Sequence, residues 1–157
     1  MLESCTHDQI SANENVDASL YQMAMDTEGY SWYKYSDTAL PKSSGSGHSN
    51  PKLRTRYNLL AASFLDSNGL VVPGTQFPDG STIVKELMSN TEVIERYAVL
   101  FKDSNHAYAD ANGWVWGYID ADGTVAVKAS DKGQACINCH SQADHIDYGL
   151  MNKAFPL

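Results

Sequence analysis

Residues 114–120 read Trp-Val-Trp-Gly-Tyr-Ile-Asp, with an aromatic side chain at every second position at the start of the run. This alternation is typical of a β-strand, because successive side chains point to opposite faces of a sheet. Two earlier runs, Ser81–Leu87 and Tyr97–Lys102, predict further strands, and turn signals lie at Phe77–Gly80 and Asp122-Gly123. The order of these segments predicts an antiparallel sheet with the aromatic stripe packed in its core.

The residues before these strands predict helices, a loop and one more strand. Apolar residues recur at helix-like intervals from Val16 to Trp32, and a short helix is expected at Leu59–Asp66. The Ser- and Gly-rich segment Pro41–Pro51 predicts a flexible loop, and Lys52–Asn58 alternates basic and other residues like a strand with one charged face. We expect an α+β fold, mainly an antiparallel β-sheet with flanking helices, as a single domain over residues 16–157.

Length and charge exclude several classes of function. The chain has 157 residues and a formal net charge of −8, which fits one acidic domain. Nucleic-acid binding is excluded because a phosphate-binding surface needs clustered Lys and Arg. Membrane spanning is excluded because the longest apolar runs, such as Tyr97–Phe101, fall far short of the roughly 20 residues required. An acidic patch that docks a basic redox partner stays compatible with this charge.

The motif Cys136-Ile-Asn-Cys139-His140 carries the strongest chemical signal. Cys-x-x-Cys-His is the attachment pattern of haem c. Two thiols three positions apart on a helical turn can reach the two vinyl groups on one edge of a porphyrin, and the adjacent imidazole can then bind the iron. We therefore expect one covalent haem c on a C-terminal helix, with His140 as the iron ligand.

Two other interpretations of the cysteines fit less well. A thioredoxin-like dithiol would follow an early strand and open a helix in a βαβ unit, whereas this motif lies near the C-terminus with no such pattern before it. A structural zinc site would need a second pair of ligands, and Cys5 is the remaining cysteine. Haem c therefore stays the leading interpretation.

Attachment of haem c takes place outside the cytoplasm, so we expect an exported, periplasmic protein. No signal peptide is visible at the start of the sequence, which suggests a mature or trimmed chain. Residues 1–15 are expected to form a mobile tail. Cys5 is interpreted as a free thiol on this tail, and the alternative is an acylated lipoprotein cysteine, although Glu3 and Ser4 fit a lipobox poorly.

The position of the motif bears on the second axial ligand of the iron. Met151 lies eleven residues after His140, too close for an easy reach around the porphyrin. We therefore expect an open distal site, at which small molecules can bind or react. A C-terminal motif also suggests a cytochrome c-prime helical bundle, but the strand signals argue against that fold.

Lys85 is the second informative residue, on the same face of its strand as Ile83 and Leu87. One interpretation is a snorkelling lysine, or an edge-strand lysine, whose amine extends to solvent. The other is a lysine whose amine reaches the haem edge, where burial would lower its pKa and expose a neutral, nucleophilic amine. Periodicity alone favours the first.

Taken in order, several segments resemble the cytochrome P-460 family over about residues 45–150. The matching segments are Gly47-His48, Leu53–Thr55, Asn58, Phe77–Leu87, Ala98–Lys102, Asn112–Tyr118, Cys136–His140 and Asp147-Tyr148. The resemblance implies a mainly antiparallel β fold, an open distal haem face and, by motif position, a Lys85 that cross-links to the porphyrin. Cross-linked members oxidise hydroxylamine and handle nitric oxide. The related cytochromes c-prime-beta lack the cross-link and bind nitric oxide or carbon monoxide, and the resemblance also implies a homodimer.

Other residues are weaker candidates for the haem site. Phe77 is interpreted either as an apolar wall of the haem pocket or as a core residue behind a turn. Asp131 is a candidate distal base, because hydroxylamine oxidation needs a proton acceptor, but it fits a solvated turn equally well. Arg54 and Arg56 suit haem propionates, with solvated strand charges expected for at least one. His48 is interpreted as a surface loop residue, and as a second axial ligand in the alternative.

The leading hypothesis is therefore an oxidoreductase that acts on hydroxylamine or a related small nitrogen compound. An external electron acceptor, such as a soluble cytochrome c, would take the electrons. The alternative is a c-prime-beta-like protein that binds nitric oxide or carbon monoxide without turnover. A simple electron carrier is the third class, and the lack of a well-placed axial methionine disfavours it.

Overall fold

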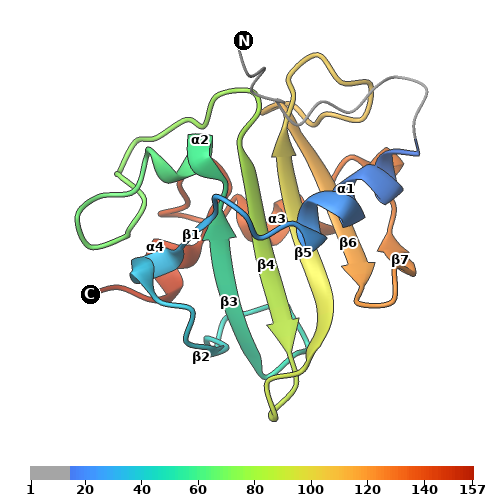
Figure 1. Ribbon diagram of the computed structural model, residues 1–157. Helices are drawn as coiled ribbons and strands as arrows, with labels where there is room; N and C mark the ends of the chain where they lie inside the picture. The colour runs from blue at the N-terminus through green and yellow to red at the C-terminus, as the bar shows by residue number, and fades with distance from the viewer. Residues whose placement is uncertain (1–14) are drawn as a thin grey trace, which may run out of the picture.

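The computed structural model describes residues 15–157, which form an antiparallel sheet with short helices on both faces (Figure 1). The strand order is β1-β3-β4-β5-β6-β7, and β2 also pairs with β3. Within this range, no helix has both the length and the apolar character needed to cross a bilayer. The elements are β1 Ser31–Trp32, β2 Leu40–Pro41, β3 Lys52–Tyr57, β4 Thr82–Met88, β5 Ile94–Lys102, β6 Trp114–Asp120, β7 Val125–Val127, α1 Val16–Met25, α2 Leu59–Ala62, α3 Gln134–His140 and α4 Met151–Ala154, with 3₁₀ turns η1 Tyr33–Tyr35 and η2 Ala129–Asp131.

The predicted α+β class is confirmed, and the four longer strands lie within a few residues of their predicted positions. The predicted helix from Val16 to Trp32 is wrong in its second half. α1 ends at Met25, Gly29 turns the chain with a φ of 74°, and Trp32 pairs with Arg56 in the sheet. β2 and β7 were not predicted, because two or three residues are too few to show an alternation.

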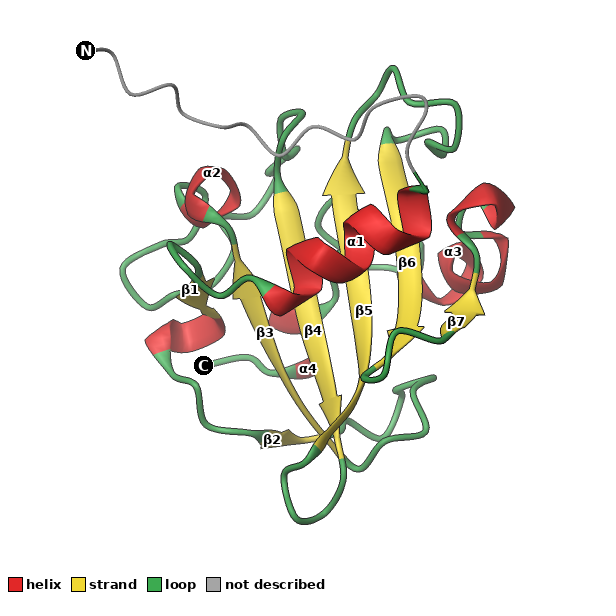
Figure 2. Cartoon of the chain, turned by 45° about the vertical axis from the view of Figure 1, so that its right-hand side comes forward, coloured by secondary structure: helices red, strands yellow, loops and turns green. Residues whose placement is uncertain are grey.

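α1 lies across one face of the sheet, over β4, β5 and β6 (Figure 2). The Asn15 side chain caps its start by accepting from the Ala18 N–H at 3.2 Å. Leu20 is fully buried, and a Cβ added at Gly117 of β6 would lie 3.0 Å from the Leu20 side chain. The glycine therefore lets the helix approach the sheet closely.

A buried ionic cluster lies on the same face. Glu86 of β4 accepts from Arg54 Nε at 2.8 Å and pairs with Arg56 Nη1 at 3.1 Å, both on β3. Arg56 is 1% exposed and also donates to the Ala24 carbonyl in α1. The partly exposed Arg54 stacks on Trp32, 4.5 Å from guanidinium carbon to ring centroid. The charged face of β3 is therefore paired with Glu86 under α1.

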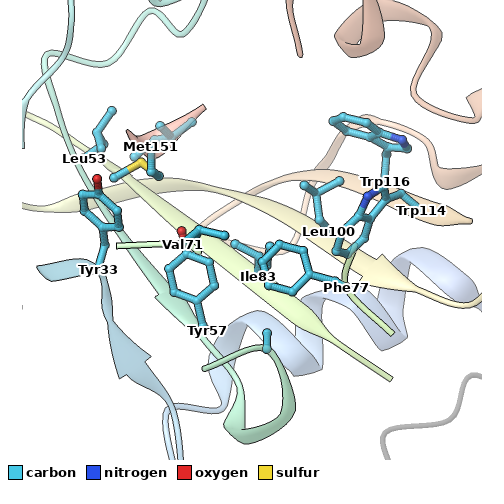
Figure 3. Close-up of a cluster of buried hydrophobic side chains, with 12 residues drawn as sticks. Tyr33, Leu53, Tyr57, Val71, Phe77, Ile83, Leu100, Trp114, Trp116 and Met151 are labelled. Atoms are coloured by element: carbon cyan, nitrogen blue, oxygen red, sulfur yellow. The ribbon is translucent and has the colours of Figure 1, made fainter. Parts of the chain in front are cut away.

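The opposite face of the sheet carries a second apolar cluster, which includes the predicted aromatic stripe. Trp114 and Trp116 are both buried there, together with Tyr57 of β3 and Phe77 (Figure 3). Met151 of α4 closes the cluster, and its sulfur accepts from the Thr55 hydroxyl at 3.3 Å. The sheet thus separates a face covered by α1 from a face covered by the C-terminal third of the chain.

Replacing Leu20 with Ala removes a fully buried side chain from the contact between α1 and β6. We expect Leu20→Ala to lower the free energy of unfolding by about 2–5 kcal/mol, measured by urea denaturation of the purified protein. Leu59→Ala is the matched control, because Leu59 is 79% exposed and its loss should stay within about 0.5 kcal/mol. Equal losses in the two variants would contradict this packing.

Candidate haem site

α3 presents the Cys-x-x-Cys-His motif beside the sheet. Gly133, in the left-handed region with a φ of 70°, precedes the helix, and a Cβ there would lie 2.5 Å from the Trp116 ring. A glycine is therefore required for two reasons, the backbone conformation and the contact with Trp116. Cys136 and Cys139 are both free thiols and only partly buried, so both sulfurs are available for thioether bonds.

His140, at the end of α3, is oriented by a hydrogen bond from Nδ1 to the carbonyl oxygen of Tyr148, at 2.7 Å. A carbonyl can only accept, so Nδ1 carries the proton and Nε2 keeps its lone pair. Burial lowers the pKa of His140, which favours the neutral imidazole. A neutral histidine held through its other ring nitrogen is the usual arrangement of a metal ligand in proteins.

The motif borders a mainly apolar cavity of about 250 Å³ between α3 and the sheet. An adjoining hollow of about 350 Å³ shares His48, Lys85, Cys139 and His140 with it. A covalent haem c requires two thiols that can form thioether bonds and an imidazole that can bind the iron. Both thiols and a neutral imidazole lie on one apolar cavity, so the residues present fit this group. Within residues 15–157, no group of three or more His, Cys, Asp and Glu side chains gathers as metal ligands.

Lys85 lies on a central strand and lines this cavity. Its register partners are Thr55 of β3 and Ala98 of β5, so the edge-strand interpretation is wrong. Burial lowers the pKa of Lys85 to about 8, and the neighbouring Cys139 partly offsets this shift. Half of the amine is therefore neutral near pH 8, well below the ordinary lysine range.

Phe77 is both a core residue and part of the cavity wall, so the structure agrees with both interpretations of this residue. It is 2% exposed and packs against Tyr57, Phe64 and Trp114 at ring-centroid distances of 6.4, 5.8 and 5.9 Å. It also lines the cavity. Its backbone N–H donates to the carboxylate of Asp147 at 2.9 Å, so the cavity wall is tied to the segment that follows α3.

Arg54 and Asp131 do not lie with the other candidates. Arg54 is on the α1 face, where its guanidinium pairs with Glu86, and it is not among the residues that line the cavity. Alternation along β3 and β4 explains this, because Lys85 and Glu86 point to opposite faces. Asp131 belongs to η2, its side chain is exposed, and it does not line the cavity either.

His48 and Tyr118 are brought together at the cavity. The structure places His48 on the cavity wall, with Nδ1 3.1 Å from the Tyr118 hydroxyl and the two rings stacked at 5.7 Å, so its interpretation as a surface residue is wrong. The pKa of His48 falls to about 3, chiefly through burial and also through nearby cations, of which Lys85 is the largest contributor. One signal in the sequence could have placed His48 at the site. It lies next to Gly47, in one of the segments that resemble the cytochrome P-460 family.

A C-terminal helix with two free thiols, a neutral histidine and an apolar cavity defines the class of c-type haem proteins. The family model for cytochrome P460 matches residues 64–149, and the chain belongs to this family. Comparisons with curated proteins and with solved structures give no match. The matched residues include Phe77, Lys85 and the whole Cys-x-x-Cys-His motif, whereas His48 lies outside them.

The lowered pKa of Lys85 predicts how the stability of the haem-free chain depends on pH. In the haem-free chain, a charged Lys85 opposes folding below about pH 8 and has no such effect above about pH 10.5, where the amine is neutral in both states. We expect Lys85→Met to melt at a higher temperature than the parent near pH 7, and the difference to shrink as pH rises from about 8 to 10.5. Lys128→Met is the control, because Lys128 is exposed. A difference that does not change with pH would contradict the burial of this amine.

Proposed function

We propose that this protein is a periplasmic mono-haem c oxidoreductase that oxidises hydroxylamine or a related small nitrogen compound. The observation that most directly supports this proposal is that Lys85 lines the same cavity as Cys136, Cys139 and His140. The pKa of Lys85 is also lowered, to about 8. Membership of the cytochrome P460 family, which includes hydroxylamine-oxidising enzymes, supports the proposal.

The residues divide into three roles. Cys136 and Cys139 would hold the haem by thioether bonds, and His140 Nε2 would bind its iron. When bound, the haem supplies the redox centre and an open coordination position for a small ligand. Phe77 would form part of the apolar wall of this cavity.

Lys85 would add a third covalent bond. Its neutral amine would form a bond from nitrogen to a porphyrin carbon, with loss of one N–H and one C–H bond. Two electrons and two protons would leave, so a two-electron oxidant such as a peroxide would have to take the electrons. A cross-linked chain would be lighter by two hydrogen atoms than the uncross-linked one, and Lys85 would tether the haem to β4.

The substrate chemistry also needs acceptors for protons and electrons. Conversion of hydroxylamine to nitric oxide releases three protons and three electrons for each molecule. Among the described residues that line the cavity there is no Asp or Glu, and the imidazole found there besides His140 is that of His48, which is neutral but weakly basic because its pKa is about 3. We propose His48 as a proton acceptor and keep exposed Asp131 as the alternative. The electrons would pass to an external acceptor such as a soluble cytochrome c, and the net charge of −8 suits a basic partner.

A second candidate function is binding of nitric oxide or carbon monoxide without turnover, as in the cytochromes c-prime-beta. The lack of a carboxylate among the described cavity residues favours it, because binding a neutral diatomic ligand requires no base. We further propose a homodimer, on the family resemblance alone.

The absorption spectrum of the dithionite-reduced, haem-loaded protein separates these functions. A strongly red-shifted Soret band indicates a cross-linked porphyrin and supports hydroxylamine oxidation, to be assayed next with an artificial electron acceptor. An ordinary five-coordinate high-spin spectrum supports ligand binding instead. A sharp low-spin α band reveals a sixth ligand and supports an electron carrier.

Replacing Lys85 tests the cross-link directly. We expect Lys85→Leu to keep both thioether bonds and to lose the red-shifted spectrum. Lys128→Leu, at an exposed position, is the matched control, because it has the same elemental composition before any cross-link forms, and it should keep the parent spectrum. The haem-bound Lys85→Leu chain should be heavier than the haem-bound Lys128→Leu chain by two hydrogen atoms. A Lys85→Leu spectrum identical to that of the parent would refute the cross-link.

Replacing the two candidate bases tests proton transfer. We expect His48→Gln to lower the turnover of hydroxylamine by about 10²-fold, the lower range for a general base, with little change in nitric oxide binding. Asp131→Asn is the matched comparison and should leave turnover within about twofold, because the Asp131 side chain is exposed. The reverse pattern would assign the base role to Asp131.

A further inference from the structure

The hydrogen bond that orients His140 comes from an unusual stretch of backbone. Its acceptor is the carbonyl of Tyr148, and both Asp147 and Tyr148 lie in the left-handed region, with φ values of 46° and 68°. Residues other than glycine seldom adopt this conformation, so surrounding contacts must hold it in place. The position of the carbonyl therefore depends on what fixes these two residues.

The Asp147 side chain is fixed by an ion pair on the cavity side of the sheet. Its Oδ2 accepts from Lys102 Nζ at 2.8 Å and from the Phe77 N–H at 2.9 Å, and its Oδ1 accepts from Trp114 Nε1 at 3.2 Å. The same indole nitrogen also donates to the Asp147 carbonyl at 3.0 Å. The Lys102 and Asp147 side chains are 8% and 4% exposed, so both charges are almost fully removed from water.

Each partner is held further by its own surroundings. Lys102 Nζ lies 4.6 Å from the centroid of the Trp114 ring, which adds a cation–π contact to the ion pair. The Tyr148 N–H donates to His145 Nδ1 at 3.0 Å. The peptide groups on both sides of Tyr148 are thus restrained, one through His145 and the other through His140.

The contribution of this ion pair to the stability of the fold does not by itself explain why a buried pair is present. Desolvating two charges offsets much of their attraction, and apolar residues of similar size often serve a core equally well. The pair fixes the position of the backbone here. The Asp147 carboxylate accepts a hydrogen bond from Phe77 in the cavity wall, and the next residue, Tyr148, carries the carbonyl that holds His140. One buried carboxylate therefore connects two parts of the site.

We infer that the buried Lys102–Asp147 ion pair is a positioning device for His140, which fixes the Tyr148 carbonyl and thereby sets the electron donation of the imidazole to the haem iron. A hydrogen bond from Nδ1 to a carbonyl raises the basicity of a ligating imidazole. Greater basicity stabilises ferric over ferrous iron and lowers the reduction potential. The inference rests on the haem c part of the proposed function, and it is independent of the substrate.

Two single variants of the haem-loaded protein separate positioning from a through-space charge effect. Asp147→Asn removes a negative charge and Lys102→Met removes a positive one, so charge alone would shift the reduction potential up in the first and down in the second. If the pair acts by positioning, both variants raise the potential. We expect each to favour ferrous over ferric iron at least tenfold, which corresponds to about 59 mV for one electron.

The iron–histidine stretching frequency of the ferrous protein, measured by resonance Raman spectroscopy, gives a second readout. We expect it to fall in both variants, because a loosened carbonyl weakens the donation from Nδ1, and to return toward the parent value in Lys102→Arg. Shifts of opposite sign in the potential, or an unchanged frequency, would overturn the inference. If Lys102→Met does not accumulate, the frequency of Asp147→Asn decides alone.

Glu86→Gln is the matched control. Glu86 is buried to the same degree as Asp147 and is also ion-paired, but on the α1 face. It should lower stability and leave the iron–histidine frequency unchanged. Failure of the parent protein itself to attach haem would refute the proposed function, which is distinguishable from failure of this inference.

Discussion

The register of β4 between β3 and β5 is the constraint on which the rest of the site depends. Lys85 lies opposite Thr55 and Ala98, which puts its amine on the cavity face, while Glu86 meets Arg54 and Arg56 under α1. A slip of one residue would exchange these two faces, bringing a carboxylate to the cavity and a lone lysine under the helix. The ionic cluster on one face and the apolar cavity on the other therefore stabilise the same register.

The haem-binding segment contributes little regular structure of its own. α3 spans only seven residues and none of them is fully buried. Because so short a helix is marginal by itself, it depends on its contacts with the sheet. Trp116 supplies one contact, packing against Gly133 before the helix and against His140 at its end, with ring centroids 5.2 Å apart in the second case. The sheet is thus the rigid element, and the motif is placed upon it.

Alternation and motif spacing predicted much of this architecture. Residues 114–120 were identified from their aromatic alternation, and the two preceding strands from their β-branched and aromatic residues beside turn signals, although both faces of these strands are largely buried. The end of α1 was missed because the pairing of Trp32 with Arg56 overrides a helical periodicity that continues in the sequence. His48 was misjudged because nothing in a Ser- and Gly-rich loop indicates that Tyr118, seventy residues later, will hold its imidazole.

By itself, the sequence determined the chemistry of the haem-binding motif, the antiparallel class and the alternate placement of Lys85 and Glu86, since each depends on residues close together in the chain. Only the tertiary structure decided which strand face carries the cavity. It also decided that Arg54 lies away from that cavity and that the Tyr148 carbonyl holds His140. The physical reason is that these outcomes depend on contacts between distant segments, such as Lys102 with Asp147, and on left-handed backbone that local residue preferences do not favour.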